Sequence, residues 1–111
     1  MSIAANYNIV VEQHSDWERE FQIKQGGVVK DITGFTFTAQ IRERTQSSTS
    51  YDFTGAIVDA TDGEFKLTMT DTLTATIPAG DYVWDLVQTD DSGVKTRLLQ
   101  GKCSVTAGVT R

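Results

Sequence analysis

The side chains that could perform chemistry are few and lie far apart in the sequence. The chain has one histidine, His14, in a polar turn, and one cysteine, Cys103, on a different segment. A Cys–His nucleophile needs a third group to orient it, and a zinc site needs about four ligands, usually Cys or His. Cys103 is also in phase with apolar neighbours at period two, which is typical of a small buried residue. The sequence therefore predicts neither a cysteine nucleophile nor a zinc site.

Three acidic residues, Asp59, Asp62 and Glu64, form a cluster of oxygen ligands that calcium could use. Their spacing does not match an EF-hand, because Gly63 follows Asp62 directly and no distant glutamate completes a loop. Asp and Gly at this density are typical of a hairpin turn. We therefore expect no metal site here. The chain has no glycine-rich phosphate loop, nucleophile elbow or HExxH motif, so the sequence predicts a protein that is not an enzyme and has no cofactor.

Asp85 is the one carboxylate in an unusual place. It lies within YVWDLV, flanked by apolar residues on a segment expected to be a central strand. A buried carboxylate is costly unless it is paired. Arg42 and Arg97 are the cations available from other strand-like segments. We expect a structural pair between Asp85 and one of these two arginines, on one face of a sheet.

The composition describes one small acidic domain. The chain has 111 residues and a net charge of −5, which argues against nucleic acid or an anionic membrane as a partner. No apolar run is long enough to span a bilayer, and no signal peptide is evident. A single cysteine fits synthesis in a reducing cytosol. We expect one domain over residues 1–111, with a short N-terminal arm (1–6) and a C-terminal tail (106–111).

Short segments with period-two alternation predict an all-β fold. The longest stretch, Tyr82–Val105, reads as a hairpin that turns at residues 90–93, where Gly93 supplies a positive φ. One helical turn is expected over Asp71–Ile77, capped by Thr70 or Asp71. The other strands are expected at Tyr7–Gln13, Trp17–Lys24, Val28–Ile32, Phe35–Arg44, Tyr51–Val58 and Glu64–Thr70.

Tyr82 and Trp84 point to a particular kind of all-β fold. A strand, a short turn-like crossover and then Gly80-Asp81-Tyr82 resemble the corner between strands E and F of immunoglobulin domains, where a Tyr hydroxyl bonds to backbone upstream. Trp84 then takes the core position that cysteine holds in antibody domains. We expect an immunoglobulin-like antiparallel β-sandwich of about seven to eight strands. The alternative is that Tyr82 is simply a β-favouring aromatic residue.

Several short motifs, in order along the chain, resemble small virion proteins of tailed bacteriophages. The similarity is to proteins common in T4-like phages of marine cyanobacteria, which themselves resemble the N-terminal domain of upper baseplate proteins. The motifs are Ile9-Val10-Val11-Glu12-Gln13, Asp31-Ile32-Thr33-Gly34, Gln40-Ile41-Arg42, Ile77-Pro78-Ala79-Gly80-Asp81-Tyr82, Trp84-Asp85-Leu86, Arg97-Leu98-Leu99-Gln100-Gly101 and Val109-Thr110-Arg111.

The resemblance implies a non-enzymatic structural protein, made in the host cytoplasm and present in many copies on the virion. Its partners would be other virion proteins, at the tail or baseplate. A capsid decoration protein and a carbohydrate- or receptor-binding module are the alternatives, and Tyr51 is the one aromatic residue we would test for sugar stacking. The terminal segments are short, almost uncharged and suited to adding to a neighbour's sheet. The interface candidates are Ser2, Ile3, Ala4, Ala5, Asn6, Val109, Thr110 and Arg111.

Overall fold

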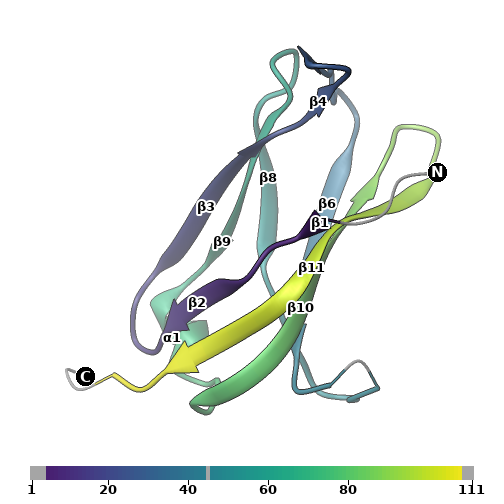
Figure 1. The fold of residues 1–111 in the computed structure, drawn as a ribbon. Coiled ribbons are helices and arrows are strands. Elements are labelled where there is room, and N and C mark those ends of the chain that lie inside the picture. The colour runs from purple at the N-terminus through teal and green to yellow at the C-terminus, as the bar shows by residue number, and fades with distance from the viewer. Residues whose placement is uncertain (1–4, 45, 109–111) are drawn as a thin grey trace.

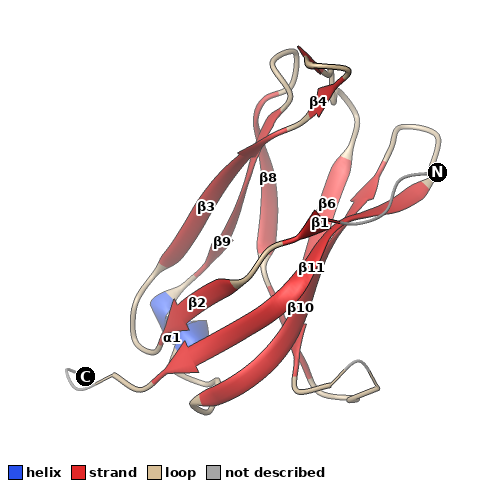
Figure 2. Cartoon of the chain, viewed as in Figure 1, coloured by secondary structure: helices blue, strands red, loops and turns tan. Residues whose placement is uncertain are grey.

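Eleven strands and one short helix make up the regular structure of the part of the chain described by the computed structural model, residues 5–44 and 46–108 (Figures 1 and 2). The all-β fold expected from the sequence is confirmed. In chain order the elements are β1 (Ala5–Asn6), β2 (Ile9–Glu12), β3 (Trp17–Gln22), β4 (Lys24–Gln25), β5 (Val28–Val29), β6 (Thr36–Arg42), β7 (Ser50–Asp52), β8 (Thr54–Asp59), β9 (Glu64–Met69), α1 (Asp71–Thr74), β10 (Gly80–Thr89) and β11 (Lys95–Thr106).

The strands form two facing sheets and one small hairpin. The six-stranded sheet has the order β1-β11-β10-β6-β7, and β2 also pairs with β11. The three-stranded sheet has the order β3-β9-β8, and β4 and β5 form the separate hairpin. The long hairpin predicted near the C-terminus is present as β10 and β11, and it supplies the middle of the larger sheet. Both β1 and β2 run parallel to β11, whereas the other pairs are antiparallel.

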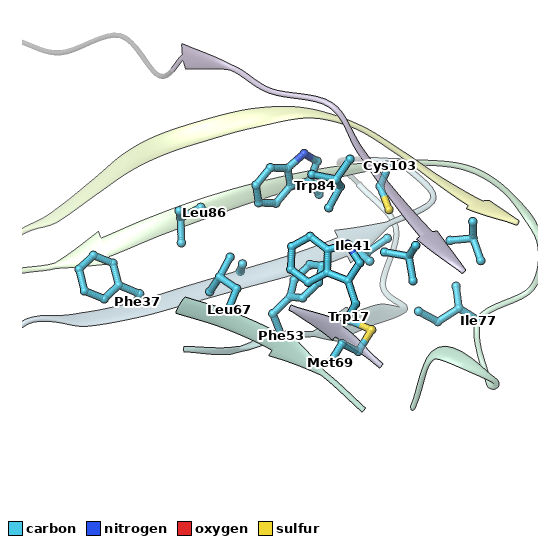
Figure 3. Packing of buried hydrophobic residues seen from close by; sticks show 14 of the residues in the cluster. Trp17, Phe37, Ile41, Phe53, Leu67, Met69, Ile77, Trp84, Leu86 and Cys103 are labelled. Carbon is cyan, nitrogen blue, oxygen red and sulfur yellow. The ribbon is translucent and has the colours of Figure 1, made fainter. Parts of the chain in front are cut away.

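The core lies between the two sheets and follows the predicted alternation (Figure 3). In β6 and β9 every second residue is buried, as expected for strands with one face on a core. Phe37 of the larger sheet stacks on Phe65 of the smaller one, with ring centroids 3.8 Å apart. Trp84 is 3% exposed, and its indole N–H donates to the Tyr7 carbonyl at 2.7 Å. This bond fixes the N-terminal segment to the core.

The connection between β9 and β10 has the geometry expected at Tyr82. Thr70 caps α1 by accepting from the Leu73 N–H at 3.4 Å, as predicted. The Tyr82 hydroxyl then donates to the Pro78 carbonyl at 2.6 Å. The ring of Tyr82 therefore holds the chain where it leaves the helical turn and enters β10.

Several of the expected strands are interrupted or shorter than predicted. Of the strand predicted over Tyr7–Gln13 only β2 forms, and β1 precedes it in residues that were assigned to the arm. The strand predicted over Trp17–Lys24 divides into β3 and β4, and that predicted over Val28–Ile32 is limited to β5. Tyr51–Val58 divides at Phe53, which is 6% exposed and ends the pairing with β6. The chain therefore changes sheets, with β7 in the larger one and β8 in the smaller. Gly55 in β8 is a point of close approach to β6: a Cβ there would lie 2.3 Å from the Phe37 carbonyl oxygen.

A β-bulge in β11 changes the face on which Arg97 lies. Leu86 is opposite Leu99, but Val87 is opposite Arg97, so Leu98 is an extra residue. By strict period-two alternation Arg97 would share the inner face with Leu99 and Cys103. The extra residue places it on the outer face instead, beside Val87.

Candidate functional site

A row of polar residues crosses the outer face of the six-stranded sheet. Residues opposite one another on adjacent strands lie on the same face. The registers connect one residue from each of five strands. From β1 to β7 this polar row consists of Asn6, Gln100, Asp85, Gln40 and Asp52. It contains amide donors and acceptors together with two carboxylates.

Gln40 and Arg42 are held in place by a chain of hydrogen bonds on this face. The Gln40 amide nitrogen donates to a carboxylate oxygen of Asp52 at 2.8 Å, and its amide oxygen accepts from Arg42 Nη2 at 2.9 Å. Arg42 Nη1 donates to the Ser47 carbonyl. Both ends of the Gln40 amide are therefore used, and the Arg42 guanidinium is oriented by two neutral acceptors.

Asp85 lies in a different environment from the one we expected. Its side chain is on the outer face and is 39% exposed, so the expectation of a buried carboxylate was wrong. The reason is that its apolar neighbours Trp84 and Leu86 point to the core, whereas Asp85 alternates with them. Its partner is Arg97, with 3.3 Å between Nε and Oδ2. Arg42, the other candidate, contacts Gln40 and Ser47 instead.

Because the Asp85–Arg97 pair is exposed, we expect it to contribute little to the free energy of unfolding. We expect Asp85→Asn to lower the free energy of unfolding by less than about 1 kcal/mol, because exposed ion pairs are weak. A double-mutant cycle with Arg97→Gln, measured by urea unfolding, should give a coupling of about 0.2–1 kcal/mol. A coupling above about 2 kcal/mol would show that the pair is shielded from water in solution.

The outer face is hollowed into a groove of about 690 Å³. Its lining includes four members of the polar row, all except Asp52, and two half-buried valines of β10 form part of the floor. The register places Arg42 beside Val83 and Arg97 beside Val87, so one guanidinium lies on each side of the row. The charged residues of the lining are Arg42, Arg97 and Asp85, which sum to +1 on a chain of −5.

A second surface feature is a set of exposed aliphatic side chains at one end of the molecule. Among the described residues, Val28, Val29, Ile57 and Val58 are four of the six large hydrophobic residues that are exposed. They come from β5 and from the end of β8. Hydrogen bonds from Ile23 and Ile32 to the turn after β8 hold these two elements at the same end (Figure 1). We call these four residues the apolar end.

The acidic cluster in the turn after β8 is present as expected. The carboxylates of Asp59, Asp62 and Glu64 have ligand atoms within 4.8 Å of one another. The Asp59 carboxylate accepts from the Thr61 hydroxyl at 3.1 Å and from the Asp62 N–H at 3.4 Å. These bonds are the ones that a turn rich in Asp forms.

Cys103 and His14 are not brought together. Cys103 is fully buried between β2 and β10, and burial raises the pKa of its thiol to about 12. A thiol with such a pKa carries almost no thiolate at neutral pH, so it is a poor nucleophile. His14 lies in the turn after β2 with φ at 65°.

Only some of the predicted interface residues lie within the described part of the chain. Ala5 and Asn6 are paired with β11 as β1, so they are part of this sheet and not a free arm. Thr106, assigned to the tail, is the last residue of β11. Tyr51 packs edge-on against Tyr82, with centroids 6.4 Å apart, and lies away from the groove. The other candidates, Ser2, Ile3, Ala4, Val109, Thr110 and Arg111, lie outside the described residues.

No known protein-family model matches the chain, and no curated protein matches its sequence. Within the described ranges, no helix has the length and hydrophobicity needed to cross a bilayer. Fold and surfaces together define a small all-β protein of two facing sheets, with a polar groove on the larger sheet and an exposed apolar end.

Proposed function

We propose that this chain is a non-enzymatic structural protein of a tailed-bacteriophage virion, and that it binds other virion proteins as a tail or baseplate adaptor. The ordered sequence motifs support the phage setting. The exposed apolar end supports the binding of other proteins and is the observation that carries the proposal.

We further propose that the fold is an immunoglobulin-like sandwich. In that fold strands B, E and D form one sheet, and C, F and G form part of the other. The order β3-β9-β8 fits B, E and D, and the order β6-β10-β11 fits C, F and G. The hydrogen bond from Tyr82 to Pro78, at the entry to the strand that fits F, also supports the assignment.

Four of the seven segments that carry the resemblance lie side by side in the larger sheet. Residues 40–42, 84–86 and 97–101 belong to the adjacent strands β6, β10 and β11. Residues 9–12 form β2, which pairs with the end of β11. Motifs far apart in the sequence therefore form one continuous sheet, as expected if the resemblance reflects a shared scaffold.

The apolar end is the candidate protein contact that the described residues offer. Exposed aliphatic side chains in groups are typical of protein contacts, since a solvated surface gains nothing from them. The edges of the three-stranded sheet are β3 and β8. β3 carries Glu18, Arg19 and Glu20, and charges on an edge strand discourage pairing with another sheet. β8 has no charge before Asp59.

The contact is tested by placing charges on the apolar end. Phage carrying Val28→Lys and Ile57→Lys together should incorporate at least about tenfold less of this protein, because two buried ammonium groups oppose the contact. Quantitative mass spectrometry of purified virions measures the incorporation. Val94→Lys, at another exposed valine (57%) in the β10–β11 turn, is the matched control and should incorporate normally.

Two results would contradict the proposal at different points. Absence of the unaltered protein from purified virions would reject the virion assignment. Normal incorporation of the doubly substituted protein would reject the apolar end as the contact. A cryo-EM map of the virion then decides the location: rings of density at the tail or baseplate support the adaptor, and density on the capsid lattice makes the protein a decoration protein.

A further inference from the structure

Arg42 is a positioned cation without an acidic partner. Among the described residues it forms no ion pair, whereas Arg97 on the other side of the polar row is paired with Asp85. Its guanidinium is held by Gln40 and Ser47, which are neutral acceptors. A guanidinium has five N–H donors in a fixed fork, which suits a carboxylate. Arg42 therefore retains both its charge and unused donors beside the groove.

The rest of the groove offers groups that hydroxyls can use. Gln100 and Asn6 carry amides that both donate and accept, and Thr38 adds a hydroxyl. The Asp85 carboxylate can only accept hydrogen bonds, and Arg97 already contacts one of its two oxygens. An acceptor of this kind requires a ligand with O–H or N–H donors.

We propose that the groove binds a sugar acid, with its carboxylate on Arg42 and its hydroxyls on the polar row. The combination of groups carries this choice. A simple anion would use Arg42 but make no use of the remaining acceptor capacity of Asp85 or of the Asn6 and Gln100 amides, and a neutral sugar would leave the charge of Arg42 unpaired. A volume of about 690 Å³ lies within the range of small-ligand sites and leaves room for one or two sugar rings.

The site needs little rearrangement to bind such a ligand. Gln40 is fixed by Asp52 on one side and by Arg42 on the other, so the guanidinium is already oriented. A preorganised donor loses less conformational entropy when it binds. The positive sum of the lining charges also sets the groove apart from the acidic remainder of the chain. The inference is independent of the apolar end, which comes from other elements.

Three compounds distinguish the contribution of the ligand's carboxylate from that of its hydroxyls. Glucuronate carries the carboxylate and the hydroxyls, glucose carries the hydroxyls alone, and acetate carries the carboxylate alone. NMR titration of the purified full-length chain with each compound should show saturable shifts of the backbone amides of residues 38–42 and 83–87 with glucuronate. Its Kd should be at least about tenfold lower than that of glucose or acetate, since charge-assisted hydrogen bonds add to the neutral ones.

Substitutions then locate the carboxylate. Arg42→Gln should weaken glucuronate binding about tenfold, to the level of glucose binding. Lys102→Gln removes a cation from the same face of β11 but outside the groove lining, and it should have no effect. Thermal unfolding of each variant confirms that the fold is kept. Equal binding of acetate and glucuronate, unchanged binding in Arg42→Gln, or no saturable binding of glucuronate would each overturn the proposal.

Discussion

Replacing Trp84 with alanine is expected to lower the free energy of unfolding by about 3–5 kcal/mol, the usual cost of removing a large buried aromatic ring. Trp84 is 3% exposed and lies edge-on to Phe53 and to Tyr7. Its N–H also satisfies the Tyr7 carbonyl. The substitution therefore opens a cavity between the sheets and releases the segment that joins β1 to β2.

Thermal and urea unfolding followed by circular dichroism measure this loss. For a domain of this size, it corresponds to a fall in Tm of more than about 10 °C. Trp84→Phe keeps most of the apolar volume but not the N–H donor, so it should cost less than Trp84→Ala. Val94→Ala, at an exposed site, should change stability by no more than about 0.5 kcal/mol. A loss below about 1 kcal/mol in Trp84→Ala would contradict the packing described for this residue.

The second large effect is expected from Gly55→Ala. The backbone of Gly55 has no positive φ, so alanine can adopt it, and alanine is ordinarily better than glycine in a strand. The added Cβ, however, would lie 2.3 Å from the Phe37 carbonyl oxygen and 3.3 Å from Phe37 Cβ. Relief requires β8 and β6 to move apart, because the nearest contact is with backbone. We expect a net loss of about 1–3 kcal/mol, as for other overpacked sites.

Ala56→Ser is the matched control for Gly55→Ala. Ala56 is the next residue of β8 and is exposed, so a change there should be nearly neutral. Urea unfolding of the two variants should therefore differ by at least about 1 kcal/mol. If Gly55→Ala were as stable as the original chain, β8 and β6 would be farther apart in solution than in this structure.

Period-two alternation was enough to predict most of the core. Phe37, Ala39 and Ile41 in β6 point inward as expected, and so do the apolar residues of β9. The turn between β10 and β11 also follows its sequence, because Gly93 adopts a φ of 87° and its N–H donates to the Asp90 carbonyl. These features depend on neighbouring residues alone, and so the local sequence determines them.

The features that were missed depend on contacts between distant segments. No local signal marks Leu98 as the extra residue of β11, so the face of Arg97 could not be predicted. The change of sheet at Phe53 is caused by packing against Trp17 and Trp84, which lie in other strands. Asp85 was misplaced for a different reason: apolar neighbours on both sides suggested burial, although alternation alone would have turned it outward. Alternation places each member of the polar row on an outer face. To predict that these residues lie side by side, the pairing registers of the five strands would also have to be known.

The pairing of β1 and β2 with β11 also bears on how the protein is made. The Lys102 N–H donates to the side chain of Asn8, 94 residues earlier, and β2 lies along the end of the last strand. At about 5–20 residues per second, translation takes roughly 5–20 s to span this distance. During this time the apolar residues of β2 have no strand to pair with. Folding of the larger sheet can be completed only after the last strand has been synthesised, so the N-terminal segment must remain soluble, or be protected, until then.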